Sequence, residues 1–139
     1  MPIVISPETI LEEIKRDVKY TLQKEIKDKI NIKFVNVHEG VLAFVKNGEL
    51  SIYINETPYM QAKMLGKQYE YLYVIELHEY LHLLGIADER EVRRISIELL
   101  EKKFGQNSYA YSLAYRLADP RDMYLIKSQK LYGKPNTYI

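Results

Sequence analysis

The sequence contains no cysteine and no tryptophan, and only three of its 139 residues are histidine. Without cysteine the chain can form no disulfide, no thiolate metal site and no cysteine nucleophile, so His, Asp and Glu must bind any metal ion. Lys and Arg (20) nearly balance Asp and Glu (19), and the two signs are interspersed, so we expect no nucleic-acid partner. These absences direct attention to the three histidines.

Long apolar runs are also missing. No stretch approaches the roughly 18 apolar residues of a membrane span, and the start MPIVISPETILEEIKRD lacks the basic and apolar regions of a signal peptide. We therefore expect a cytoplasmic protein with no membrane partner. The length suits a single domain, residues 1–139. Abundant Lys, Glu, Ile and Tyr are typical of a thermophilic source.

A long amphipathic helix is expected over residues 6–29. Ser6 can cap its start, and Pro7 suits the first helical position. Apolar residues then recur about every four positions, which predicts one buried face. These residues are Ile10, Ile14, Val18, Leu22 and Ile26.

Three short strands are expected next, because the apolar period changes to two. Their positions are Ile32, Phe34 and Val37 in the first, Val41 to Lys46 in the second, and Leu50, Ile52 and Ile54 in the third. Glu39-Gly40 and Asn47-Gly48 suit tight turns between them. We therefore expect an antiparallel meander whose last strand, residues 49–55, lies near an edge of the sheet.

The strongest helix pattern covers residues 68–84. A shorter helical stretch begins before it at Thr57-Pro58 and is interrupted at Gly66, whereas Gly85 ends the strong helix. Asp88 can then cap a further helix that carries acidic residues in its first turn. The helices and strands together predict an α+β fold.

The C-terminal part of the chain is also expected to be helical. The helix after Asp88 ends near Phe104, and residues 105–139 predict two more short helices separated at Asp119-Pro120. A small antiparallel or mixed sheet of about three strands would pack on the N-terminal helix, the strong central helix and the helix that follows it. Residues 1–104 would form the main body of the domain, and residues 105–139 a helical C-terminal segment.

Two of the three histidines occur as His78-Glu79-Tyr80-Leu81-His82 within the strongest helix. At 3.6 residues per turn this spacing places both imidazoles on one face, where they can bind one metal ion. Glu79 projects beside them, where it can accept a proton from a water molecule. This is the HExxH pattern of zinc peptidases. A purely structural zinc site would close with four protein ligands, so an open, catalytic Zn²⁺ site is favoured.

Three acidic residues are candidates for a third metal ligand: Asp88, Glu89 and Glu91. With about 100° per residue, the buried face of the following helix lies about 50° from Glu89, whereas Glu91 points about 110° away from it. Asp88 flanks the same face but is also the expected helix cap. Glu89 has the longer reach and is the preferred ligand, with Asp88 and Glu91 left as alternatives.

The segment from His78 to Leu100 resembles the HExxH plus glutamate-helix signature of gluzincin metallopeptidases. The short chain and the order of its elements are similar to those of archaeal minigluzincins, minimal versions of membrane-embedded prenyl-protease catalytic domains. Two features differ from the usual pattern. Arg93 stands where many gluzincins place an Asp or Asn, and the spacing between His82 and Glu89 is short.

The resemblance implies a zinc metallopeptidase that hydrolyses peptide bonds. His78, His82 and Glu89 would bind Zn²⁺, and Glu79 would take a proton from a zinc-bound water and pass it to the leaving amine. A peptide or protein substrate would pair with the strand containing Leu50, Ile52 and Ile54. Residues 1–104 would then form the catalytic core. The helices of residues 105–139 would either pack against the sheet or a second subunit or, as the resemblance implies, shield the cleft as in a latent enzyme or zymogen. His38 or a tail tyrosine would stabilise the oxyanion.

Other functions remain open on the residues alone. The chain would alternatively be a catalytically silent zincin-like scaffold or a regulatory binding module that keeps the metal site. A hydrolase of non-peptide substrates is a third option, because zinc-activated water attacks other electrophiles. The pattern fits either a monomer or a homo-oligomer.

Overall fold

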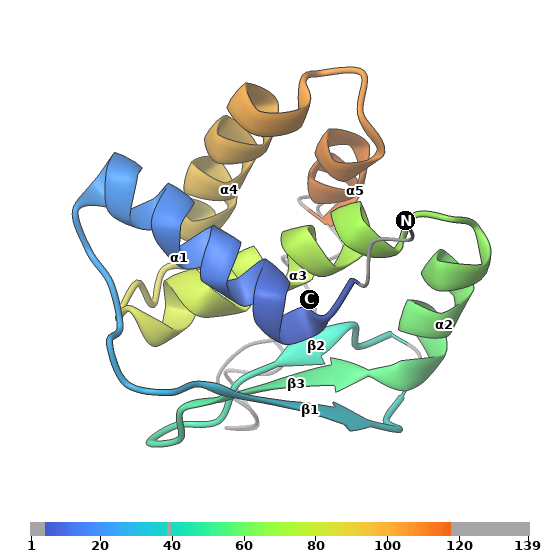
Figure 1. Cartoon of the computed structure of the whole chain (residues 1–139), viewed down its shortest axis with the longest axis horizontal. Coiled ribbons are helices and arrows are strands. Elements are labelled where there is room, and N and C mark those ends of the chain that lie inside the picture. The colour runs from blue at the N-terminus through green and yellow to red at the C-terminus, as the bar shows by residue number, and fades with distance from the viewer. Residues whose placement is uncertain (1–4, 39, 118–139) are drawn as a thin grey trace.

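The structure, a computed structural model, describes residues 5–38 and 40–117 and has the expected α+β fold. In chain order its elements are α1 (Pro7–Leu22), β1 (Asn31–Val35), β2 (Ala43–Phe44), β3 (Ser51–Asn55), α2 (Glu56–Met64), α3 (Gln68–Leu83), α4 (Glu89–Phe104) and α5 (Tyr109–Leu117). Figure 1 shows the sheet beneath α1 and α3, with α4 and α5 farther from it. The second expected C-terminal helix, after Asp119-Pro120, lies outside the described residues.

The sheet is mixed, with the strand order β1-β3-β2. β2 pairs antiparallel to β3 across the turn at Asn47-Gly48, as expected, and Gly48 has a positive φ of 76°. β1, however, pairs parallel to β3, with Asn31 opposite Ser51 and Val35 opposite Asn55, so the expected meander is wrong. Alternating apolar residues set which face of a strand is buried but do not select its neighbour.

The central position of β3 also corrects the expected substrate edge. β3 has a strand on each side, and Ile52 and Ile54 are 0% exposed. Leu50 precedes the strand and is 37% exposed. The expectation that Leu50, Ile52 and Ile54 lie on an open edge is therefore wrong, because the outer strands are β1 and β2.

The N-terminal helix begins as expected but ends earlier. The Ser6 hydroxyl accepts a hydrogen bond from the Thr9 amide at 3.1 Å, and Pro7 occupies the first turn. The helix ends at Leu22 rather than near residue 29, because Gln23 takes a left-handed conformation with φ 54°. Ile26 therefore lies beyond the helix, where its amide donates to the Tyr80 hydroxyl at 3.0 Å.

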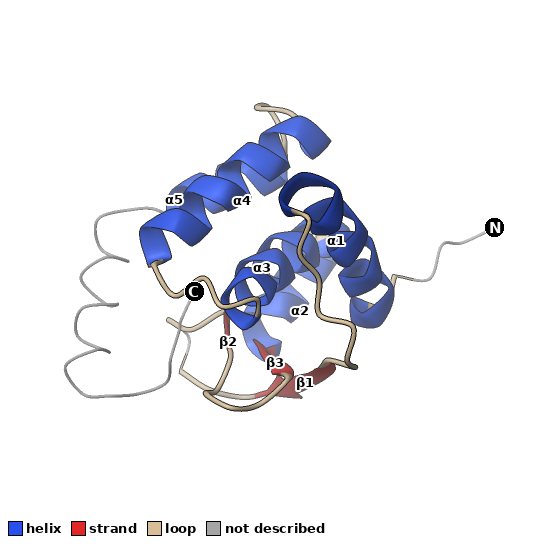
Figure 2. Cartoon of the chain, turned by 90° about the vertical axis from the view of Figure 1, so that its left-hand side faces the viewer, coloured by secondary structure: helices blue, strands red, loops and turns tan. Residues whose placement is uncertain are grey.

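Helix α3 is the centre of the structure and contacts every other helix as well as β2 and β3. All eleven residues from Tyr71 to Leu81 are buried, as expected for a helix covered on all sides. Figure 2 shows α1, α4 and α5 covering it on the side away from the sheet. α5 adds the buried Leu113 to the same core, so the described part of the C-terminal segment packs into the domain. No helix within residues 5–38 and 40–117 is long and apolar enough to cross a membrane.

Candidate metal centre

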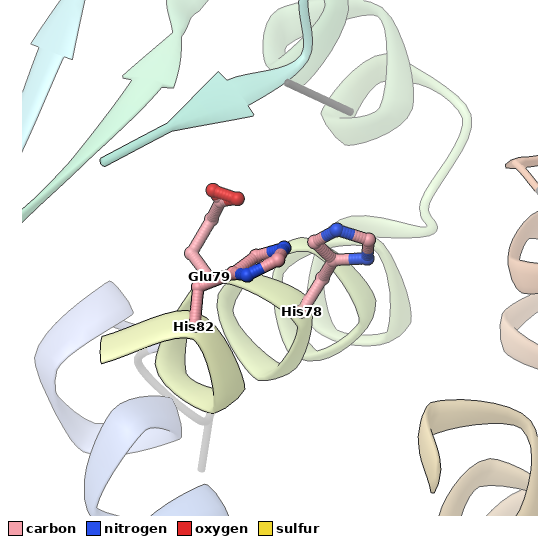
Figure 3. Close-up of side chains that lie close together, drawn as sticks. All are labelled: His78, Glu79 and His82. Carbon is pink, nitrogen blue, oxygen red and sulfur yellow. The ribbon is translucent and has the colours of Figure 1, made fainter. Parts of the chain in front are cut away.

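His78 and His82 lie one turn apart on the buried face of α3, near its C-terminal end. Their ring centres are 5.0 Å apart, and each side chain is 4% exposed. Figure 3 shows both rings above the helix, with the Glu79 carboxyl beside them. The ligand atoms of these three residues all lie within 4.8 Å of one another. In the described part of the chain, this is the one such group of at least three His, Asp or Glu.

Glu89, the first residue of α4, completes this group from a second element. One of its oxygens lies 3.1 Å from His78 Nε2, and the other lies 2.7 Å from His82 Nε2. The Glu89 side chain is 8% exposed. The structure therefore places Glu89, the preferred third ligand, against both imidazoles.

The facing atoms of this cluster are not satisfied by hydrogen bonds. His78 Nε2, His82 Nε2 and both carboxyl oxygens of Glu89 are buried and have no hydrogen-bond partner, although they lie within ion-pair distance. Buried polar atoms in folded proteins nearly always have such a partner. A metal ion would satisfy all of them together, since two imidazoles and one carboxylate are a common catalytic zinc set.

The protonation of His82 is set by the turn between α3 and α4. Its Nδ1 lies 2.8 Å from the carbonyl oxygen of Ile86, to which Nδ1–H donates. The lone pair of the neutral ring is then on Nε2, which faces His78 and Glu89. A hydrogen bond from the outer nitrogen to a backbone carbonyl is the usual way in which a protein orients a metal-binding histidine.

Burial and the shared carboxylate shift the three pKa values in different directions. Burial lowers the pKa of His78, and Arg93 adds to this, against the opposing effect of Glu89. Burial also disfavours the charged form of His82, but Glu89 and Glu79 outweigh it and raise its pKa. For Glu89, burial alone would raise the pKa, but the two imidazoles hold it well below its usual value. Glu89 is therefore an anion at neutral pH, as a metal ligand must be.

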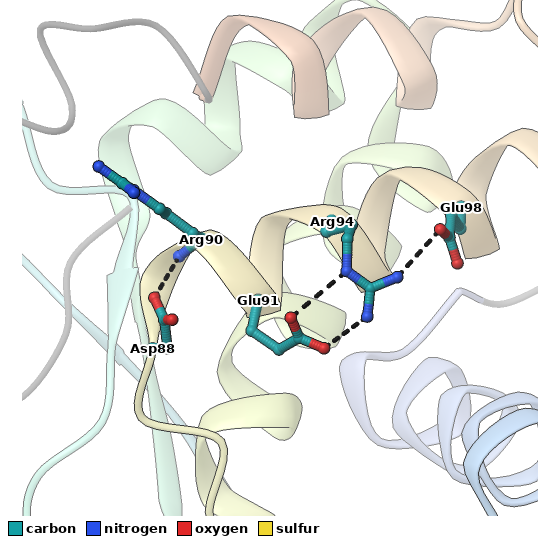
Figure 4. A network of polar contacts seen from close by, with 5 residues as sticks. All are labelled: Asp88, Arg90, Glu91, Arg94 and Glu98. Carbon is teal, nitrogen blue, oxygen red and sulfur yellow. Dashed lines mark hydrogen bonds and ion pairs between the residues drawn. The ribbon is translucent and has the colours of Figure 1, made fainter.

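The other two candidate ligands are engaged elsewhere. The Asp88 carboxylate caps α4 by accepting a hydrogen bond from the Arg90 amide at 2.9 Å. Glu91 points to the outside of α4, where it pairs with Arg94, which also binds Glu98 at 3.1 Å (Figure 4). Each arrangement leaves Glu89 as the acidic side chain that faces His78 and His82.

Glu79 is 0% exposed and lies between the two histidines in the sequence. In Figure 3 its side chain extends from α3 toward the side of the sheet. A buried carboxylate at this place can accept a proton from a water molecule held near the histidines. Tyr80, the next residue, is directed elsewhere, because its hydroxyl binds the Ile26 amide.

Two polar residues of α4 beside His78 were not assigned a role from the sequence. Arg93 and Ser96 are 8% and 5% exposed and, with His78, line a cavity of about 10 Å³, the size of one water molecule. Arg93 stands where the gluzincin pattern has an acidic or amide residue, so a cation flanks this histidine instead.

His38, the third histidine, is exposed in the loop after β1. Its Nδ1 accepts a hydrogen bond from the Gly40 amide at 3.0 Å. Asn55 stabilises this loop, because its side-chain amide donates to the carbonyls of Val37, His38 and Val41. The role of His38 in stabilising an oxyanion stays a prediction.

Comparisons with protein-family models, with curated proteins and with solved structures found no match to this chain. The cluster of His78, His82 and Glu89 is therefore the feature of this chain that indicates a function.

Proposed function

We propose that the protein is a zinc-dependent metallopeptidase in which His78, His82 and Glu89 bind Zn²⁺ and Glu79 acts as the general base. One observation carries this proposal. The Nε2 atoms of both histidines lie 3.1 and 2.7 Å from the two oxygens of one carboxylate, and none of these buried atoms has a hydrogen-bond partner. Three protein ligands leave a fourth position for water or substrate, which is the arrangement of catalytic zinc sites.

The residues of the proposed site have separate roles in hydrolysis. When bound, zinc supplies a Lewis acid that acidifies water and polarises a carbonyl group. Glu79 takes the proton of the attacking water on its carboxylate and returns it to the leaving amine. His82 is held in its ligand tautomer by the carbonyl of Ile86. The Glu89 carboxylate would contribute one negative charge that partly offsets the charge of the metal ion.

The strand order of the sheet supports a different position for the substrate. β2 is an outer strand that contacts α3, the helix bearing the two histidines. An extended peptide would pair with the outer edge of β2 by main-chain hydrogen bonds. This places the peptide next to Ala43 and Phe44, in place of the expected pairing with the central strand.

Metal analysis of purified variants tests the site. We expect the parent protein and Glu79→Gln to bind one zinc ion per chain, and His78→Ala to lose it. Hydrolysis of a generic peptide should be lost in both variants. Equal zinc binding by the parent and His78→Ala would contradict the proposal. If the parent and Glu79→Gln both bind zinc but neither hydrolyses the peptide measurably, a silent scaffold or regulatory module is favoured.

A second comparison tests the third ligand. Glu89→Ala should weaken zinc binding by more than about 100-fold, because it removes a charged ligand, whereas loss of an outer group typically costs about 10- to 100-fold. Glu91→Ala is the matched control, because it removes a carboxylate two positions from Glu89 that faces away from the histidines. It should change zinc affinity by less than about threefold. Asp88→Ala should lower stability by about 1 kcal/mol through loss of the helix cap while leaving zinc affinity unchanged. Isothermal titration with zinc measures the three affinities, and urea unfolding measures the stability of Asp88→Ala.

A further inference from the structure

A second cleft lies along α3, toward the helix start and away from the two histidines. It has a volume of about 500 Å³ and lies between α2, α3 and α5. Its lining is largely apolar and includes Leu65, which is 72% exposed, and the buried Leu113. Its size is in the range of sites that accept a small ligand or a bulky side chain.

Tyr71 of α3 gives this cleft a specific polar group. The residue is 4% exposed, it lines the cleft, and its hydroxyl is buried without a hydrogen-bond partner. Burial raises the pKa of Tyr71, so the group remains a neutral phenol that can donate. A phenol in such a place normally has a partner. The structure therefore offers an unused donor to an acceptor atom of a bound molecule.

The cleft is connected to the metal centre by the geometry of α3. Tyr71 precedes His78 by seven residues, which is two helical turns, or about 10.5 Å along the same face. Leu117 lines both this cleft and the small cavity beside His78. An extended peptide advances about 3.3 Å per residue, so about three residues cover this distance.

The charged groups around the cleft favour a negatively charged ligand. Arg116 is exposed and lines the cleft, and the Lys67 ammonium lies 5.8 Å from the centre of the Tyr109 ring, which also lines it. The acidic Glu70 is nearby, but its carboxylate accepts a hydrogen bond from the Ala110 amide at the start of α5. Cationic groups at the rim would attract a carboxylate next to the bound side chain.

We propose that this cleft binds a bulky apolar residue of a peptide that also carries a carboxylate at or next to that residue. The side chain enters the apolar lining, a backbone oxygen accepts from the Tyr71 hydroxyl, and the carboxylate lies against Arg116. This inference rests on the proposed function, which it deepens: the substrates are peptides with such a residue about three positions from the scissile bond.

The test measures binding directly, by NMR titration of the metal-free full-length chain. The probes are N-acetylphenylalanine, its uncharged amide, and N-acetylalanine. We expect N-acetylphenylalanine to bind at least about tenfold more tightly than N-acetylalanine, because its ring fills apolar space. Shifts should concentrate on the residues that line the cleft. Equal binding of these two probes, or shifts located elsewhere, would overturn the proposal.

Two substitutions separate the polar contributions. Tyr71→Phe removes one hydroxyl and should weaken all phenylalanine probes about fivefold. Tyr111→Phe in α5, outside the lining, is the matched control and should change nothing. Arg116→Ala should weaken N-acetylphenylalanine about threefold but leave its amide unchanged. A Tyr71→Phe affinity equal to that of the control, or an Arg116→Ala loss shared by the amide, would contradict the assigned contacts.

This experiment and the zinc measurements fail independently. If zinc binds and a generic peptide is hydrolysed but the probes do not bind, the cleft proposal is wrong and the peptidase proposal stands. If the probes bind as expected and the chain binds no zinc, the peptidase proposal is wrong and the cleft remains a site for apolar acids. With both in place, Tyr71→Phe should lower kcat/KM for a peptide containing phenylalanine more than for one containing alanine.

Discussion

Replacing Glu76 with Met should stabilise the protein. Glu76 lies in the middle of α3, is 0% exposed, and neither of its carboxyl oxygens has a hydrogen-bond partner. Burial raises the pKa of this carboxyl well above its usual value, and the Glu8 carboxylate raises it further. The folded state therefore contains a buried acid whose solvation by water has been lost without replacement.

The size of the effect follows from those two oxygens. A buried polar group without a partner costs about 1–3 kcal/mol. Met has a similar length and an unbranched side chain, and it needs no hydrogen bond. Glu76→Met should therefore raise the free energy of unfolding by about 1–3 kcal/mol. Glu76→Gln removes the acid but keeps two polar atoms, so its gain should be smaller. Urea unfolding at pH 7, followed by circular dichroism, measures both.

An exposed glutamate provides the control. The Glu12 side chain on α1 is 65% exposed and lies 3.7 Å from Lys15, so Glu12→Met should change stability by less than about 0.5 kcal/mol. A loss of more than about 1 kcal/mol in Glu76→Met, with Glu12→Met neutral, would refute the reasoning. It would mean that the Glu76 carboxyl has a stabilising partner in the folded protein. Zinc content of the variant shows separately whether the metal centre is kept.

Two other polar contacts give further predictions. Tyr73 is buried, and its hydroxyl donates a hydrogen bond to Asp17 at 2.5 Å. The burial and this hydrogen bond each raise the pKa of Tyr73. Because tyrosine in the unfolded chain ionises near pH 10 and folded Tyr73 does not, stability should fall as the pH rises above about 10. Tyr73→Phe should reduce this fall in unfolding measurements between pH 9 and about 11, and an unchanged slope would contradict the assignment. Asn55→Ala should lower stability by about 2–3 kcal/mol in urea unfolding, because the carbonyls of residues 37, 38 and 41 lose their donor. A loss below about 0.5 kcal/mol would show that water replaces the amide.

Helical features were predictable because they depend on neighbouring residues. Ser6 caps α1 and Asp88 caps α4, as the sequence predicts, and each accepts a hydrogen bond from an amide two or three residues later. The four-residue spacing of His78 and His82 places both rings on one face of α3. In a regular helix, sequence spacing alone determines direction, so these positions needed no information about the rest of the fold.

The strand order was not predictable from the same kind of pattern. β1 pairs with β3 in parallel across a separation of 20 residues, from Asn31 to Ser51. Period-two alternation is equally compatible with parallel and antiparallel neighbours, and a short connection favours the hairpin that the sequence predicts. The alternation of apolar residues gives no information on the Asn55 side chain. This side chain binds the loop between β1 and β2 and holds it away from a tight turn. An asparagine at the end of a strand has no sequence signal for that role.

The position of Glu89 combines both kinds of information. The direction of each side chain around α4 could be calculated from the helical period. In the structure Glu89 faces the histidines and Glu91 faces away from them, as that calculation predicts. Distance to the histidines depends on the connection, which spans only residues 84–88 and turns at Gly85 with φ 103°. Such a short link requires the first turn of α4 to start beside the last turn of α3, where His82 lies. The short spacing between His82 and Glu89, which departs from the gluzincin pattern, therefore brings the glutamate to the histidines instead of keeping it from them.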